Sequence, residues 1–103
     1  MDLVKNELMS DLLGIYGKLL TEYQLEIMEL YYLEDLSLKE IADNQNVSRN
    51  AIFTLIKRVE KILLDYEDKL RLNSKLKKVE NRLKNENSEL REDIINILLE
   101  EGE

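Results

Sequence analysis

Apolar side chains recur at helical spacing in the middle of the chain, in two runs that a polar stretch separates. In the first run, Leu38, Ile41 and Ala42 lie three and four residues apart, so one face of a helix carries all three. Ala42 is small enough to let a second helix cross closely. The second run has its apolar positions at the same spacing, at Ile52, Leu55, Ile56 and Val59. The pattern predicts two packed helices joined by a turn.

Polar residues at the ends of these runs indicate where the helices begin. Ser37 precedes Glu40 by three residues, so each side chain can accept a hydrogen bond from the other's free backbone N–H at a helix start. Residues 44–46 are Asn-Gln-Asn, which are poor helix formers, and asparagine adopts the left-handed conformation more readily than most residues. We expect the chain to turn there, with Val47 filling the corner and Ser48 capping the second helix.

The side of the second helix that faces away from the apolar run carries residues suited to nucleic acid. Arginine and asparagine can make paired hydrogen bonds to base edges, lysine, serine and threonine suit phosphates, and an aromatic ring can contact a thymine methyl. The candidate nucleic-acid-binding residues are Ser48, Arg49, Asn50, Phe53, Thr54, Lys57 and Arg58. Residues 37–58 are therefore predicted to form a helix-turn-helix motif.

The first part of the chain predicts two further helices. The first runs from about Asp2 to Tyr16 and ends at Gly17. Its apolar side is predicted to carry Leu8, Leu12, Ile15 and Leu19. Gly14 and Gly17 either permit close helix packing or are one helix end and one tolerated glycine, and the second interpretation is favoured.

A second capping signature, Thr21 followed by Gln24, starts a helix that we expect to reach about Asp35. This helix is predicted to bury Ile27, Leu30 and Tyr31. The adjacent Tyr31 and Tyr32 could stack on bases, but a half-buried tyrosine packs well and needs only one partner for its hydroxyl, which favours the core.

Beyond the motif, the apolar face continues through Leu63, Tyr66 and Leu70 and weakens at Asn73–Ser74, where the helix is expected to break or bend. Residues 71–103 then allow two structures. Leucine or isoleucine recurs every seven residues, and a second line of positions resembles a coiled-coil seam with a polar asparagine. These two lines are Leu76, Leu83, Leu90 and Ile97, and Glu80, Asn87 and Ile94. The favoured alternative is a tail that folds back over the first helix, with Asn87 or Ser88 capping a separate last helix.

Composition narrows the function classes. The 103 residues include no cysteine, histidine or proline and only three glycines, which favours an all-α protein and leaves no disulfide, thiolate or imidazole chemistry. We expect no catalysis, no cofactor and no metal site. The start lacks the features of a signal peptide, and no run reaches the ~18 apolar residues of a spanning helix, so we expect a cytoplasmic protein without membrane insertion.

Charge is unevenly distributed along this acidic chain, whose net charge is −7. Residues 1–36 hold 2 basic and 8 acidic side chains, whereas residues 37–61 hold 5 and 3. Residues 62–103 are again acidic, with 8 basic and 11 acidic side chains, although residues 69–84 hold seven basic residues and one acidic residue. The motif is therefore the positive third of the chain, as DNA binding requires, and residues 69–84 are either a second binding patch or a solvated face.

Two stretches of this sequence resemble known bacterial proteins. LTEYQLEIMELYYLEDLSLKEIA followed by VSRNAI resembles region four of sigma factors. Over more of the chain, LLTEYQ, ELYYLEDLSLKEIA, VSRNAIF and IKRVEKILLDYEDKL resemble the YlxM-like family. The chain departs from the family pattern at Gln45, where an apolar residue is usual, and at Asn46, where glycine is usual.

The resemblance implies an all-α, winged-less helix-turn-helix of the sigma region-four type. We expect this domain in residues 1–70 and a C-terminal helical extension in residues 71–103. In the YlxM-like family the gene lies beside that of the signal recognition particle GTPase, which implies an accessory or regulatory role in protein targeting.

Two hypotheses follow from these residues and from the resemblance. The favoured one is a DNA-binding regulator, whose partner is double-stranded DNA and which would gain affinity as a homodimer. The other is an adaptor that uses the motif surface or residues 69–84 to contact the signal recognition particle GTPase or its RNA. Arg49 and Asn50 at the helix start favour DNA, whereas Phe53 would suit an apolar protein contact as well as a thymine methyl.

Overall fold

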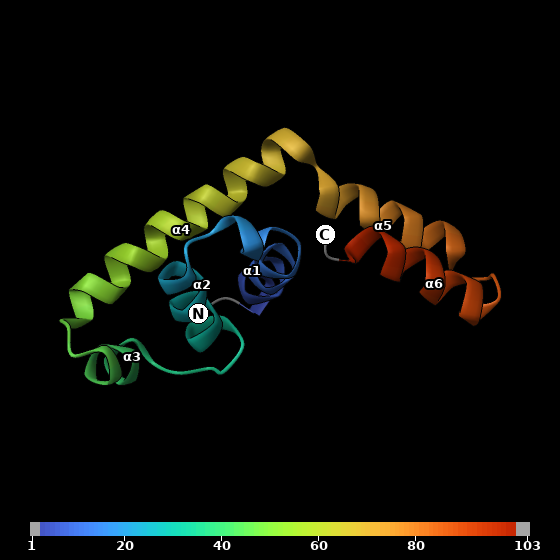
Figure 1. Cartoon of the computed structure of the whole chain (residues 1–103). Helices are drawn as coiled ribbons and strands as arrows, with labels where there is room; N and C mark the ends of the chain where they lie inside the picture. Colours follow the sequence, from blue (N-terminus) through green and yellow to red (C-terminus); the bar gives the residue numbers. More distant parts are fainter. Residues whose placement is uncertain (1–2, 101–103) are drawn as a thin grey trace. The chain divides into compact units, whose positions relative to one another are not determined.

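The computed structural model describes residues 3–100, and helices with short connections account for its regular structure (Figure 1). The helices are α1 (Leu3–Tyr16), a 3-10 turn η1 (Gly17–Leu19), α2 (Glu22–Tyr32), α3 (Leu38–Gln45), α4 (Arg49–Leu70), α5 (Leu72–Leu83) and α6 (Ser88–Leu99). Residues 3–100 contain no strand, so the all-α prediction is confirmed. Contacts divide the chain between Leu70 and Arg71 into an N-terminal unit and a C-terminal unit.

Helix α4 organises the N-terminal unit because it packs against each of α1, α2 and α3 (Figure 1). Its apolar stripe recurs at helical spacing and is buried at Ile52, Ile56, Val59 and Leu63. The other three helices complete the core with Met9, Leu12, Leu13, Tyr16, Ile27, Met28, Ile41 and Ala42. The predicted apolar runs of α3 and α4 are thus confirmed, with Leu38 and Leu55 partly buried at their edges.

The buried face of α1 differs from the predicted one. Leu12 is fully buried, but Leu8 and Ile15 are only partly buried and Leu19 is 58% exposed. The prediction assumed that one helical period runs through Leu19, whereas α1 ends at Tyr16 and the chain tightens into a 3-10 turn. A 3-10 helix has about 3.0 residues per turn, whereas an α-helix has about 3.6, so the direction of Leu19 departs from the apolar face of α1. The predicted start at about Asp2 lies outside the described residues.

The two glycines have different surroundings. A side chain at Gly14 would meet nothing within 4 Å, so this glycine is simply tolerated in the helix. At Gly17, an added Cβ would lie 3.1 Å from Leu25 Cδ1, so here the backbone of η1 does approach the side of α2 closely. Gly17 also follows the last residue of α1, which confirms the predicted helix end.

Helix α2 begins as predicted and ends earlier. Thr21 Oγ1 accepts from Gln24 N–H at 3.1 Å and Gln24 Oε1 accepts from Thr21 N–H at 3.0 Å, which confirms the capping box. The helix ends at Tyr32 rather than near Asp35, which has a left-handed φ of 58°. Tyr31 and Tyr32 pack edge to face beside the core, as the favoured interpretation predicted.

The C-terminal unit is a hairpin of two helices. The backbone breaks at Arg71, whose φ is 56°, two residues before the predicted Asn73–Ser74, which instead lie in the first turn of α5. The coiled-coil seam, the less favoured of the two alternatives, is wrong, because α5 ends at Leu83 and the chain turns before Asn87. Asn87 Oδ1 accepts from the N–H groups of Glu89 and Leu90, so the asparagine caps a separate last helix, as the other alternative predicted.

None of the helices within residues 3–100 combines the length and the apolar character needed to cross a membrane.

The different burial of Leu12 and Leu19 can be tested with a matched pair of variants. We expect Leu12→Ala to lower the free energy of unfolding by about 2–5 kcal/mol, because it empties a fully buried position, whereas Leu19→Ala should change it by less than about 0.5 kcal/mol. Urea denaturation followed by circular dichroism measures both. Equal destabilisation by the two variants would show that Leu19 belongs to the core after all.

Candidate nucleic-acid interface

Reciprocal hydrogen bonds fix the start of α3, the first helix of the motif. Ser37 Oγ accepts from Glu40 N–H at 3.1 Å, and Glu40 Oε1 accepts from Ser37 N–H at 3.0 Å, so the predicted capping box is confirmed. The hydrogen bond from the backbone N–H of Ser37, and then that from its hydroxyl, hold the pKa of Glu40 below its ordinary value. Ile41 and Ala42 on the next turn are buried against the other helices. The capped start and the buried face together set the direction of α3.

The corner between the two motif helices is made by backbone groups. Asn46 has φ 59° and ψ 45°, the left-handed conformation expected of an asparagine in a sharp turn, whereas the two residues before it are still helical. The N–H of Val47 donates to the Ala42 carbonyl at 3.0 Å. The side chain of Val47 is 42% exposed, so the prediction that it fills the corner is wrong. The backbone hydrogen bond of Val47 closes the corner, and its side chain is left at the surface.

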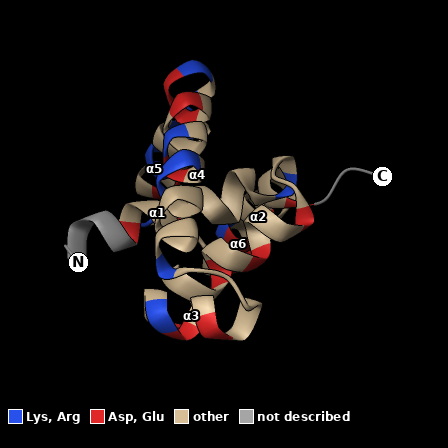
Figure 2. Ribbon diagram, turned by 90° about the vertical axis from the view of Figure 1, so that its left-hand side faces the viewer, with Lys and Arg blue, Asp and Glu red and all other residues tan. Residues whose placement is uncertain are grey.

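Ser48 begins α4, the second helix of the motif, in the predicted way. Its Oγ accepts from Ala51 N–H at 3.0 Å and its carbonyl accepts from Ile52 N–H at 3.3 Å. Ile52 and Ile56 are buried, which fixes the rotation of the helix about its own axis. The predicted binding residues consequently all lie on the exposed side, at Ser48, Arg49, Asn50, Phe53, Thr54, Lys57 and Arg58. Basic and acidic positions along α4 can be followed in Figure 2.

A buried acid that the sequence interpretation missed lies directly beneath these residues. Glu60 is only 6% exposed, on the side of α4 that packs against α2. Its carboxylate accepts a hydrogen bond from the hydroxyl of Tyr32, and Lys57 Nζ lies 3.3 Å from its Oε1. Its position one turn after Ile56 and three residues before Leu63 was the available signal, because those neighbours share a buried stripe.

This network changes the role of Lys57. Its ammonium lies between the buried carboxylate and the ring of Phe53, whose centroid is 5.6 Å away. A phosphate that captured Lys57 would take a partner from the buried acid, which is costly in a poorly solvated place. Lys57 is therefore exposed as predicted, but its charge is already used in the fold. The remaining outward residues, Arg49, Asn50, Thr54 and Arg58, can offer hydrogen-bond donors to DNA without this cost.

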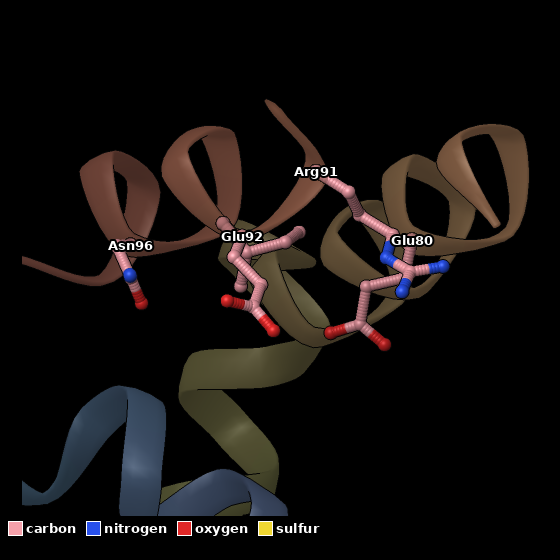
Figure 3. Close-up of a pocket in the computed structure, with 5 residues that line it drawn as sticks. Glu80, Arg91, Glu92 and Asn96 are labelled. Carbon is pink, nitrogen blue, oxygen red and sulfur yellow. The ribbon is translucent and has the colours of Figure 1, made fainter. Parts of the chain in front are cut away.

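The rest of the described chain offers less to a ligand. Within residues 3–100, no three acidic, histidine or cysteine side chains are grouped so that they could hold a metal ion. A surface hollow of about 360 Å³ in the C-terminal unit is lined by Glu80, Arg91, Glu92, Ile95 and Asn96 (Figure 3). Its charged side chains come from both α5 and α6 and have opposite signs, which is typical of a solvated helix junction. The outward side of α4 therefore carries the functional argument.

The chain is similar to a family of small bacterial proteins along almost its whole length. The family model described as "UPF0122: Putative helix-turn-helix protein, YlxM / p13 like" matches residues 3–100. A "UPF0122 protein" of Clostridium perfringens is 50% identical over 92 residues, which are 82% of this chain and 81% of the relative. One of Clostridium kluyveri is 49% identical over 76 residues, 74% of this chain and 68% of the relative. One of Clostridium acetobutylicum is 54% identical over 72 residues, 70% of this chain but only 62% of the relative.

We expect Lys57→Ala to lower the free energy of unfolding by about 1–2 kcal/mol, because it removes the cation beside the buried carboxylate of Glu60. The effect is limited because the Lys57 side chain itself is half exposed to solvent. Arg58→Ala, which removes the same charge from the exposed side, should cost less than about 0.5 kcal/mol. Urea denaturation compares the two. Replacing Glu60 by glutamine in the Lys57→Ala background should recover part of the stability, and an equal effect of the two single variants would contradict the network.

The hydroxyl of Tyr32 should make the free energy of unfolding depend on pH in the alkaline range. Burial, and then its hydrogen bond to Glu60, raise the pKa of Tyr32 well above its ordinary value of 10.0. A group whose pKa is raised in the folded state stabilises the fold fully at pH values below its ordinary pKa. As the pH rises above that value, the group ionises first in the unfolded chain, so its contribution to the free energy of unfolding is lost. The free energy of unfolding should therefore fall above pH 10 more steeply in the wild type than in Tyr32→Phe. Parallel loss of stability above pH 10 in the wild type and in Tyr32→Phe would contradict this role of the hydroxyl.

Proposed function

Because the chain belongs to the YlxM/p13-like helix-turn-helix family, we propose that it binds double-stranded DNA and acts as a regulator, with α4 as its recognition helix. The observation that carries the proposal is the exposed N-terminal half of α4. Arg49, Asn50, Phe53 and Thr54 lie on its first two turns, where a recognition helix contacts base edges in the major groove. This half is also rigid, because Ser48 caps it and Ile52 anchors it in the core.

The side chains suit distinct parts of a DNA duplex. The guanidinium of Arg49 and the amide of Asn50 match the paired donors and acceptors of guanine and adenine edges. Phe53, 43% exposed, can contact a thymine methyl. Thr54 and Arg58 lie further along the same side and suit phosphates, which set the register of the helix on the duplex. Lys57 contributes little to this interface because of its ion pair with Glu60.

Charge supports the same surface. Residues 37–61 hold 5 basic and 3 acidic side chains, whereas residues 1–36 hold 2 and 8, so within the N-terminal unit duplex DNA would be attracted to the motif and repelled from the preceding helices. With few phosphate contacts, a single copy should bind weakly at physiological salt. A second copy bound to an adjacent half-site would raise the affinity.

The second candidate function is an adaptor that contacts the signal recognition particle GTPase or its RNA, as the family resemblance implies. The observation that favours it is Phe53, a large exposed ring next to the ammonium of Lys57, since such a pair also suits a protein surface. Here too the outward side of α4 would make the contact, so the two functions differ in partner rather than in site.

The test is fluorescence anisotropy of labelled duplex DNA from the gene's own upstream region, titrated at about 50 and 200 mM salt. We expect binding that weakens with salt, and an Arg49→Ala, Arg58→Ala double variant that binds far more weakly. Each phosphate interaction that a substitution removes should reduce the log–log salt slope by about 0.9. Both substitutions are at exposed positions, so the fold should be kept.

The matched control is the Lys69→Ala, Lys84→Ala double variant, which removes the same charge from exposed positions outside the motif. It should bind nearly as well as the wild type. Equal weakening of DNA binding in the two double variants would show that the interaction is a nonspecific attraction of charges. Absence of binding by the wild type would overturn the DNA proposal and make the adaptor the function to test.

A further inference from the structure

Three basic side chains form an exposed row on α5. Lys75, Lys78 and Arg82 follow one another at three- and four-residue spacing, so they lie on one face of the helix. This row borders a groove of about 330 Å³ between α5 and α6. The groove is lined by Lys78, Val79, Arg82, Leu83 and Ile94. The face thus combines an apolar floor with a positive edge, and is called here the basic groove.

The C-terminal unit leaves apolar surface next to the basic groove. Leu90 is 51% exposed and Ile97 is 64% exposed, and both lie on the same side of α6 as Ile94. No residue of α6 is buried, so the hairpin of two 12-residue helices has almost no core of its own. Such a small helical unit gains stability when another surface covers its apolar side.

The N-terminal unit carries a surface of the opposite kind on α2. Glu22, Glu26 and Glu29 are exposed and lie four and three residues apart, so they share the outward face of this helix. Apolar side chains accompany them, since Tyr23 is 42% exposed and Leu33, four residues beyond Glu29, is 54% exposed. This acidic face is the outward side of a helix whose inward side is fixed by the buried Ile27 and Met28.

The two faces are equal in length, opposite in charge and similar in apolar content. The acidic row runs from residue 22 to 29 and the basic row from residue 75 to 82, so each spans eight residues, and its first and last residues are about 10.5 Å apart along the helix axis. Within residues 3–100, the structure gives none of these six charged side chains an ion-pair partner. Exposed apolar side chains border both rows.

We propose that the acidic face of α2 in one copy of this chain docks on the basic groove of a second copy. Each chain carries both faces, so a twofold axis would form the contact twice, as a symmetric dimer requires. An unrelated acidic helix could satisfy the basic groove alone, whereas a second copy satisfies both faces and covers Leu33 and Ile97 in the same assembly. Doubling the contact also supplies apolar area that neither face has alone.

Sedimentation of the whole chain with charge-reversed variants tests this contact without DNA. The wild type should sediment as a dimer of a 12.2 kDa chain at micromolar concentration. Glu26→Lys and Lys78→Glu should each weaken self-association by about tenfold or more, because each places like charges opposite one another. An equimolar mixture of these two variants should form the dimer again, since each mutated face then meets a complementary one.

Two control variants test whether a charge reversal elsewhere on the chain also weakens self-association. Glu7→Lys changes an exposed position of α1, and Lys61→Glu changes an exposed position of α4, so both reverse one charge outside the two rows. Both should sediment as the wild type does. A wild type that stays monomeric would overturn the proposal. The proposal would also be overturned if the Glu26→Lys, Lys78→Glu double variant formed the dimer and the mixture of the two single variants did not. That result would place the contact within one chain.

Discussion

The packing of one apolar stripe determines most of what the N-terminal unit can do. Ile52, Ile56, Val59 and Leu63 lie along α4, and this helix packs against α1, α2 and α3 alike. Successive residues of a helix are rotated by about 100°, so burial of this stripe leaves no freedom in which side chains face outward. The identity of the candidate binding surface is therefore a consequence of core packing, and a substitution in the stripe would alter the interface as well as the stability.

The same packing explains why the outward residues are not equivalent. Glu60 belongs to the packed side of α4, and its carboxylate is satisfied by the hydroxyl of Tyr32 and the ammonium of Lys57. One positive charge of the motif is thus committed to holding α4 against α2. The side chains left for a partner are concentrated at the start of α4, where the helix is capped and anchored. A lysine can be exposed and still belong to the structural network beneath it.

Local chemistry was predictable from the sequence, and longer-range geometry was not. The capping pairs at Thr21 and Ser37 and the left-handed Asn46 were predictable because a few neighbouring residues determine them. The burial of Leu19 was predicted wrongly, because it required knowing that α1 tightens after Tyr16. The coiled-coil seam failed for a related reason, since Asn87 fits both a seam position and a helix cap, and only the structure shows which role it takes. Glu60 was missed because its partners come from another helix as well as from its own.

Charge and apolar content together separate the two positive surfaces of the chain. At the start of α4, arginine and asparagine present planar groups of donors on a rigid helix, which suits the edges of bases. The basic groove instead combines a row of three cations with the apolar side chains of Val79, Leu83 and Ile94. Nucleic-acid phosphates accept hydrogen bonds from polar groups and gain nothing from an apolar floor. An acidic helix with its own apolar side chains matches that floor and that row, and α2 supplies such a helix in every copy. The two surfaces therefore call for partners of different chemistry, so one chain could engage both at once.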